Sequence, residues 1–331
     1  MHNINISESY TLIMDNIVWN YGNLSDVHDD LLVFNTMYVD NAAIESRGLV
    51  CSRNGRAVGF VSIYTYNIFF KKIFISKSGI LLVNNDFFSD AVSSLKKFII
   101  KNNLLIVFNV DYCYYKKLTR IDKNICFLGN KKTIVNSIDR DENEWLMSIR
   151  PKHRHSVRKG LKGNHQCYVK SVDNMSLLEI KKLYDIYVEN MNFRKAVLLF
   201  STQEEFINFI ERNLKNTFFT FCYKGGKLAY FNVIHTNYKI ANYIMAVTTK
   251  SGMASYASYA GVYELYNYLY KNEFNFLNFG GIDPINNHGV YFFKKGFSGE
   301  IVSIPKYIAI GGKFYMSIMS RVAKFKNKQH V

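Results

Sequence analysis

Apolar positions along the first half of the chain predict short strands and one long helix. Apolar runs at 48–52 and 57–64 flank Asn54-Gly55, and Asn-Gly between two such runs is a strong signal for a β-hairpin. From Phe87 to Lys101 apolar residues recur every three or four positions, which is typical of an amphipathic helix, and the run at 104–108 predicts a buried strand. The pattern therefore predicts a mixed α/β fold.

A similar order returns in the second half of the chain. The expected helices and strands cover 177–191, from a Ser201–Glu204 capping box to about 214, 218–223, 228–235, 239–247 and about 259–272. Gly225-Gly226 is followed by a basic residue and an apolar strand, as is Asn54-Gly55 in the first half. Two copies of a hairpin–strand–helix–strand unit indicate two similar α/β domains in tandem, and chance similarity of two hairpins is the alternative.

Residues 139–144 are charged or polar throughout and are the best candidate for a domain boundary. Their acidic side chains suit the positive end of a helix dipole, so we expect a helix to begin here. Pro151 is expected to break or kink that helix.

Composition limits the possible partners and compartments. The 331 residues include 42 Lys and Arg against 26 Asp and Glu, a formal net charge of +16. Such a surplus favours polyanionic partners such as RNA, nucleotide-linked substrates or an anionic membrane surface; lysines that only solvate the surface are the alternative. No apolar run approaches the roughly 18–20 residues of a membrane span, and the first residues lack the features of a signal peptide, so a cytoplasmic protein is expected.

Several familiar kinds of site are not indicated. The five cysteines are scattered singly, which predicts free and mostly buried thiols, and no His or Cys spacing indicates a metal. A P-loop, a dinucleotide-binding glycine motif and a GxSxG elbow are also absent from the sequence. Catalysis is therefore expected to depend on positioning and electrostatics more than on a covalent nucleophile.

The most distinctive stretch lies near the C-terminus. An apolar run ends in Gly280 and Gly281, and the aromatic sequence Tyr-Phe-Phe-Lys-Lys-Gly-Phe follows at 291–297. Glycines allow positive φ and close approach of a substrate. Lys294, placed among aromatic side chains, can stabilise the oxyanion of an acyl-transfer intermediate, and an ordinary surface lysine is the alternative.

Other candidate residues carry weaker signals. Arg150, Arg154 and Arg158 are four apart, on one face of a helix that can grip a phosphate or can simply be solvated. Arg194 ends an amphipathic helix, where an arginine more often complements the helix dipole, and Tyr243 lies on a strand, where a tyrosine is usually part of the core.

Together these elements resemble the FemABX family of non-ribosomal peptidyltransferases, most clearly over residues 145–307. The resemblance rests on the order of a basic helix, a helix ending in arginine, a glycine-turn hairpin and Phe-Gly-Gly-Ile followed by Phe-Lys-Lys-Gly-Phe. It implies two tandem GNAT-like domains, mixed sheets flanked by helices, over 1–144 and 145–307. The last segment, 308–331, would pack back on the first domain.

The same resemblance implies a function and roles for single residues. Lys294 matches the lysine that stabilises the transition state of aminoacyl transfer in the family. Arg194 and Tyr243 match contacts to the phosphates of a UDP-linked acceptor. Members transfer an amino acid from aminoacyl-tRNA to an amine of a peptidoglycan precursor without metal or cofactor, and contact with the inner membrane face is possible for a lipid-linked acceptor.

One departure and two alternatives stay open. The family often has Asp where this chain has Asn278, before the paired glycines. Related N-acyltransferases share the GNAT-like core, so acyl-CoA-dependent acylation of an amino sugar of a surface polysaccharide is one alternative, although 250–254 is a poor pyrophosphate-binding loop. A catalytically idle basic adaptor for RNA or membranes is the other. A cleft lined by Arg154, Arg158, Arg194, Tyr243 and Lys294 would favour the enzyme.

Overall fold

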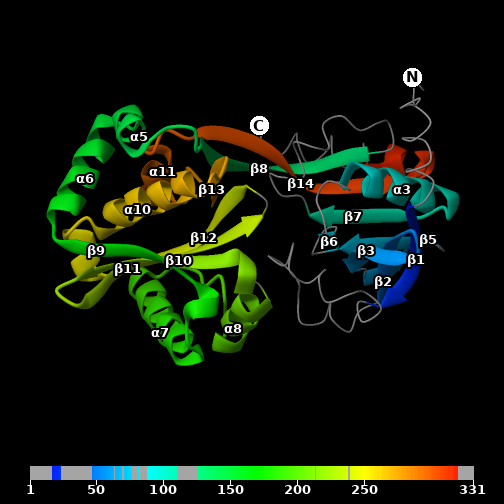
Figure 1. Cartoon of the computed structure of the whole chain (residues 1–331). Helices are drawn as coiled ribbons and strands as arrows, with labels where there is room; N and C mark the ends of the chain where they lie inside the picture. Colours follow the sequence, from blue (N-terminus) through cyan, green and yellow to red (C-terminus); the bar gives the residue numbers. More distant parts are fainter. Residues whose placement is uncertain are drawn as a thin grey trace, which may run out of the picture. The chain divides into compact units, whose positions relative to one another are not determined.

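The chain forms two compact units in a computed structural model, one from residues 1–131 with 304–331 and one from 132–303 (Figure 1). The structure describes residues 17–23, 47–62, 64–68, 71–76, 81–82, 88–109, 125–212, 214–237, 239–285 and 287–319. The boundaries of the units fall inside two strands, β8 (Ile125–Ser137) and β14 (Glu300–Gly311). The expected division into GNAT-like domains at 144/145 and 307/308 stays a prediction.

The first unit is a mixed α/β structure. Its described elements, besides parts of β8 and β14, are β1 (Ile17–Asn23), β2 (Arg47–Arg53), β3 (Arg56–Ser62), β4 (Tyr64–Ile68), β5 (Lys71–Ser76), β6 (Leu81–Leu82), α3 (Phe88–Lys101) and β7 (Leu105–Asn109). The predicted amphipathic helix is confirmed as α3, and its apolar face is buried with residues of β2, β3 and β7. Near the end of the described chain, Tyr315 packs against Leu105 of β7.

The second unit carries the candidate residues. Its sheet has the order β8-β13-β12-β11-β10-β9, antiparallel except for the parallel pair β12 and β13. Its elements after β8 are α5 (Glu142–Ser148), α6 (Pro151–Lys162), β9 (His165–Ser171), α7 (Leu177–Arg194), α8 (Gln203–Arg212), β10 (Thr217–Lys224), β11 (Lys227–Asn237), β12 (Ile240–Thr248), α9 (Lys250–Ala254), α10 (Ala257–Lys271), β13 (Phe276–Gly281) and α11 (His288–Lys295). In Figure 1, α7 and α8 cover one face of this sheet and α10 the other.

Both predicted hairpins are confirmed, and they use the same turn. Asn54 and Gly55 have φ of 53° and 75°, and Gly225 and Gly226 have φ of 54° and 72°. Positive φ at both central residues defines the type I′ turn, which matches the right-handed twist of the flanking strands. Glycine and asparagine adopt this backbone at little cost, so both turns could be predicted from these residue types in the sequence.

The helix starts of the second unit follow local capping. Asp141 accepts hydrogen bonds from two backbone N–H groups of α5, and Pro151 occupies the first turn of α6, so the predicted break is confirmed. The capping box of α8 lies one residue later than predicted. Thr202 Oγ1 accepts from Glu205 N, and the Glu205 carboxylate accepts from Thr202 N and Ser201 N.

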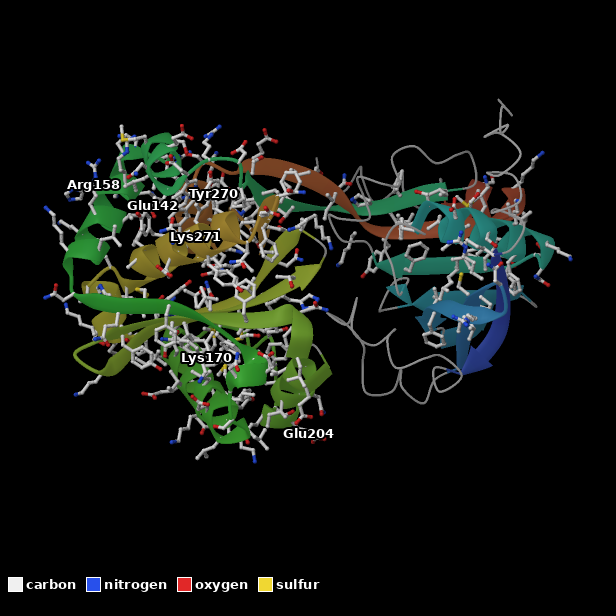
Figure 2. All side chains as sticks on the ribbon, in the orientation of Figure 1. Glu142, Arg158, Lys170, Glu204, Tyr270 and Lys271 are labelled. Atoms are coloured by element: carbon white, nitrogen blue, oxygen red, sulfur yellow. A yellow bond between two sulfur atoms is a disulfide. The ribbon has the colours of Figure 1, made fainter. Side chains whose placement is uncertain are left out.

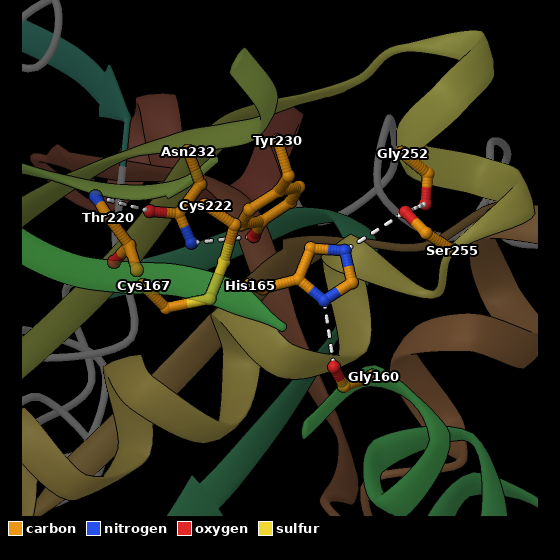
Figure 3. Close-up of a disulfide and its surroundings, with 9 residues drawn as sticks. All are labelled: Gly160, His165, Cys167, Thr220, Cys222, Tyr230, Asn232, Gly252 and Ser255. Atoms are coloured by element: carbon orange, nitrogen blue, oxygen red, sulfur yellow. Dashed lines mark hydrogen bonds between the residues drawn. A yellow bond between two sulfur atoms is a disulfide. The ribbon is translucent and has the colours of Figure 1, made fainter. Parts of the chain in front are cut away.

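The expectation of free thiols is wrong for two cysteines. Cys167 of β9 and Cys222 of β10 are directly opposite in register, with Cα atoms 4.2 Å apart, and form a disulfide (Figure 3). The reason is strand pairing between residues 55 positions apart, which spacing in the sequence does not reveal. Cys51 and Cys126 are free, and Cys113 lies outside the described residues.

In the part of the chain that the structure describes, no helix is long and apolar enough to cross a membrane. The same residues contain no group of three or more His, Cys, Asp or Glu side chains that could hold a metal ion.

Candidate active site

The paired glycines lie where two parallel strands separate. β12 and β13 pair only through Ile240–Asn242 and Phe276–Asn278, and the chain then turns at Gly280 with φ of +77°. A Cβ atom on Gly280 would lie 3.3 Å from the Tyr243 carbonyl oxygen and 4.0 Å from Lys294 Nζ. Glycine is therefore required at 280 by its backbone angle and by close approach. Gly281 has no such neighbour, and its contribution is its carbonyl group.

Lys294 extends from α11 to this turn. Its Nζ donates a hydrogen bond to the Gly281 carbonyl oxygen at 3.0 Å, and the side chain is half-buried. Burial lowers the pKa of Lys294 from 10.5 to about 8, because desolvation disfavours the charged amine. The amine is thus mainly a cation at neutral pH. A lysine carries three N–H donors, so two remain for a substrate oxygen.

Carbonyl groups at the end of α11 are held by polar groups from other elements. The Phe293 oxygen lies 3.1 Å from His153 Nε2, and the Gly296 oxygen accepts from the Arg150 backbone N–H at 3.2 Å. Asn136 Nδ2 donates to the Phe297 oxygen at 2.6 Å. These contacts place α11, and with it Lys294, against α6 and β8.

Gly296 makes room for one of these groups. A Cβ atom at this position would overlap the imidazole ring of His153, which is buried between α6 and α11. The ring packs edge-on against Phe297 and Tyr259, with centroids 5.1 and 5.3 Å apart. Burial lowers the pKa of His153, so the ring is a neutral packing and hydrogen-bonding group. The sequence alone did not indicate a role for His153. A local hint was Gly296, whose missing side chain leaves space for the ring.

Asn278 joins three strands beneath the glycine turn. Its side-chain oxygen accepts from Thr133 Oγ1 of β8 and from the Gly280 backbone N–H, the latter at 3.0 Å. Its Nδ2 donates to Asn242 Oδ1 of β12 at 3.0 Å. An amide supplies both the acceptor and the donor that this position uses. An aspartate at 278 would have no N–H to donate to Asn242 Oδ1. The asparagine found here, where the family often has Asp, therefore suits the orientation of the Asn242 amide.

Tyr243 is buried, and its hydroxyl belongs to a polar cluster in the core. The hydroxyl lies 2.8 Å from that of Tyr230, which accepts from Asn232 Nδ2 at 2.8 Å. Burial raises the pKa of Tyr243 to about 12, so the phenol is neutral. The part of Tyr243 that meets the glycine turn is its backbone carbonyl.

The predicted arginines have other neighbours. Arg194 donates to the Thr248 carbonyl at 3.0 Å, and Thr248 is about 17 Å along β12 from Tyr243. Arg154 donates to the Met147 carbonyl at 2.7 Å and so satisfies the end of α5, and Arg158 is exposed on α6. The structure thus brings together Gly280, Gly281, Lys294 and the backbone of Tyr243, and the arginines bond elsewhere or face water.

The second unit also contains a small cavity. It measures about 120 Å³ and is lined by Val135, Asn136, Ser137, Asp139, Arg140, Trp145, Ser148, Phe297, Ser298 and Glu300. Phe297 belongs both to this lining and to the aromatic packing beneath Lys294, where it stacks on Phe279 with centroids 5.7 Å apart. None of the predicted site residues lines the cavity.

Comparison with solved structures shows the fold. Over 96% of this chain and 98% of the other, the structure matches that of FemX with a TM-score of 0.58 and 12% sequence identity. The C-terminal domain of a protein assigned as a lysylphosphatidylglycerol synthetase from Agrobacterium fabrum matches with a TM-score of 0.49 and 9% identity, over 80% of this chain and 84% of that one. L-PGS from Bacillus licheniformis matches with a TM-score of 0.48 and 12% identity, over 82% and 86%.

The similarity to FemX confirms, at the level of the fold, the resemblance to the FemABX family that the sequence indicates. The TM-scores of the other two structures are below 0.5. No family model matches the sequence, and no curated protein matches it. At 12% identity the similarity to FemX shows the architecture of this chain and assigns no role to any of its residues.

Proposed function

We propose that this protein is an acyltransferase that moves an aminoacyl or acyl group to an amine of a nucleotide- or lipid-linked precursor of peptidoglycan. The observation that carries the proposal is Lys294, a half-buried cation fixed against the Gly281 carbonyl at the glycine turn, where nothing lies within 4 Å of the position of a Cβ atom on Gly281. The similarity of the fold to FemX supports the same conclusion.

In this proposal Lys294 stabilises the negative charge that forms during transfer. The acceptor amine attacks the carbonyl carbon of the donor ester, and the carbonyl oxygen becomes an oxyanion. The two unused N–H groups of Lys294 donate to that oxygen. The intermediate then collapses: the ester C–O bond breaks, the C–N bond remains, and a proton passes from nitrogen to the leaving oxygen. A donor of this kind in a dry site is worth about 10²–10³ in rate.

We propose aminoacyl-tRNA as the donor, because the segment before α10 offers little to the pyrophosphate of CoA. Residues 250–254 form the short helix α9, and three of the amides at 252–255 already have partners within this segment. Gly252 N donates to Thr249 Oγ1, Met253 N to the Thr249 carbonyl, and Ser255 N to the Ser251 carbonyl. A pyrophosphate site needs free backbone N–H groups that point toward the phosphates.

The net charge of +16 suits a donor and an acceptor that are both polyanions. UDP-linked and lipid-linked precursors both carry a diphosphate, and in this proposal they reach the enzyme on the cytoplasmic side of the membrane. Arg194, which lies at the exposed end of α7, is a candidate for contact with such a diphosphate.

A transfer assay with two donors and one UDP-linked acceptor tests this proposal. Charged tRNA and an acyl-CoA are supplied separately, and the acylated acceptor is measured by mass spectrometry. Product from charged tRNA, with loss of product in Lys294→Met, is the expected result. Product from acyl-CoA alone would contradict tRNA as the donor. Unchanged turnover in Lys294→Met would contradict the proposed role of Lys294.

A further inference from the structure

Helix α6 has one buried face and one basic face. His153, Ser156, Val157 and Gly160 are buried, and the exposed positions include Lys152, His155, Arg158, Lys159 and Lys162. These basic positions recur every three or four residues, so they lie along one side of the helix. We call these five residues the α6 basic stripe. Figure 2 shows Arg158 on the outer side of this helix, pointing away from α10.

The charges of the stripe are not compensated within the described part of the chain. The sequence of α6 contains no acidic residue, and no ion pair of the described residues involves a member of the stripe. Lys159 lies 5.3 Å above the ring of Tyr256, and its amine stays exposed. The four Lys and Arg side chains of the stripe, which form no ion pair among the described residues, raise the local positive potential, and this attracts a polyanion.

The helix is anchored at both ends, so the stripe is a fixed surface. At its start, the Arg150 N–H donates to Gly296 and His153 contacts the Phe293 carbonyl, both in the segment that carries Lys294. At its end, His165 lies 2.7 Å from the Gly160 carbonyl through Nδ1 and 2.9 Å from Ser255 Oγ through Nε2 (Figure 3). The stripe therefore begins beside α11 and leads away from it.

We propose that the α6 basic stripe binds the phosphate backbone of the RNA part of the donor, which rests on the proposed function for the identity of the donor. From Lys152 to Lys162 the helix rises about 15 Å, a length over which a nucleic-acid backbone presents several phosphates. Leu161 is the one large apolar side chain exposed on α6. A helix that inserts into a membrane surface needs an apolar face, so RNA fits this surface better than a lipid bilayer.

The test compares two triple variants that remove the same charge. Lys152→Gln/Arg158→Gln/Lys162→Gln changes the stripe, and Lys182→Gln/Lys224→Gln/Lys227→Gln changes exposed lysines on α7 and at the β10–β11 turn. Binding of an uncharged acceptor-stem minihelix of tRNA is measured by fluorescence anisotropy from 50 to 300 mM salt. Anionic vesicles of phosphatidylglycerol and phosphatidylcholine are tested in parallel by co-sedimentation.

The stripe variant is expected to bind the RNA about a hundredfold more weakly at low salt, with the slope of log affinity against log salt reduced by about 2–3. The control triple should lose far less. Equal losses in both triples would overturn the placement on α6. A loss confined to vesicle binding would replace RNA with a membrane as the partner.

These results are separable from the proposed function. Lys294→Met removes the proposed oxyanion donor and should bind the minihelix as the unaltered protein does, because the half-buried Lys294 lies outside the stripe. A protein that acylates from CoA and ignores RNA would contradict the stripe while leaving acyl transfer in place.

Discussion

Lys294 and the α6 basic stripe, both in the second unit, differ in their exposure to water. Lys294 is half-buried, is fixed by the Gly281 carbonyl and has a pKa lowered to about 8. The residues of the α6 basic stripe are exposed. A desolvated charge acts strongly on a nearby oxygen, whereas solvated charges attract a polyanion over a distance and are screened by salt. The same residue types therefore serve two purposes, chemistry at one place and binding at the other.

The largest effect is expected from removing the desolvated cation. Lys294→Met should lower turnover with charged tRNA by about 10²–10³-fold, because an oxyanion donor is lost, while acceptor affinity changes little. Lys295→Met is the matched control: this neighbour bonds to the Tyr291 hydroxyl at 2.9 Å, and its loss should cost about threefold or less. Steady-state kinetics give both values. Equal losses in the two variants would erase the distinction between the cations.

The contact between Gly296 and the His153 ring should affect both stability and turnover, because it helps to position α11. In Gly296→Ala the new methyl group overlaps the His153 ring, so we expect a loss of about 1–3 kcal/mol in the free energy of unfolding and reduced turnover. Gly289→Ala, within α11 and with open space around its Cβ position, should be neutral or stabilising. Urea unfolding followed by circular dichroism compares the two. A neutral Gly296→Ala would show that His153 does not set the position of α11.

The cost of holding Lys294 in the folded state gives a third comparison. Its pKa falls from 10.5 to about 8 on folding, so below pH 8 the folded protein carries a charge that it disfavours. Lys294→Met should therefore raise the free energy of unfolding at pH 7 by about 1–3 kcal/mol. Lys162→Met, in the exposed stripe, should change it by about 0.5 kcal/mol or less. Destabilisation by Lys294→Met would mean that its amine is well solvated.

A conservative change at the base of the glycine turn, Asn278→Asp, should alter the protein least, and Asn278→Leu is its disruptive counterpart. In Asn278→Asp the Asn242 amide can rotate and donate, so the loss in stability should be about 1 kcal/mol or less. Asn278→Leu leaves Thr133, Asn242 and the Gly280 N–H unpaired and should cost about 2–4 kcal/mol. Thermal unfolding measures both variants. Similar losses for Asp and Leu would exclude compensation by Asn242.

Local features of the chain were readable from sequence, and contacts between distant segments were not. The type I′ turns at Asn54-Gly55 and Gly225-Gly226, helix α3 and the break at Pro151 depend on nearby residues alone. The glycine pair and Lys294 stood out because their pattern is local as well, although the helical state of α11 was not predicted.

The features that were not predicted from the sequence depend on tertiary packing. His153 meets Gly296 across 143 positions of sequence, and Thr133 meets Asn278 across 145. The Cys167–Cys222 disulfide follows from the register of β9 and β10. Arg154, for which a phosphate contact stays a prediction, donates to carbonyls at the end of α5, because the break at Pro151 leaves these groups without helical partners.

The pH dependence of transfer shows whether Lys294 acts as a cation. If it does, kcat/KM with charged tRNA, divided by that of Lys294→Arg to cancel titration of the acceptor amine, falls tenfold per pH unit above about 8, as the Lys294 amine loses its proton. Lys294→Arg stays charged, so whatever activity it keeps should lack this falling limb. A ratio that does not fall above pH 8, or a falling limb that persists in Lys294→Arg, would contradict the role of Lys294 as the cation that stabilises the oxyanion.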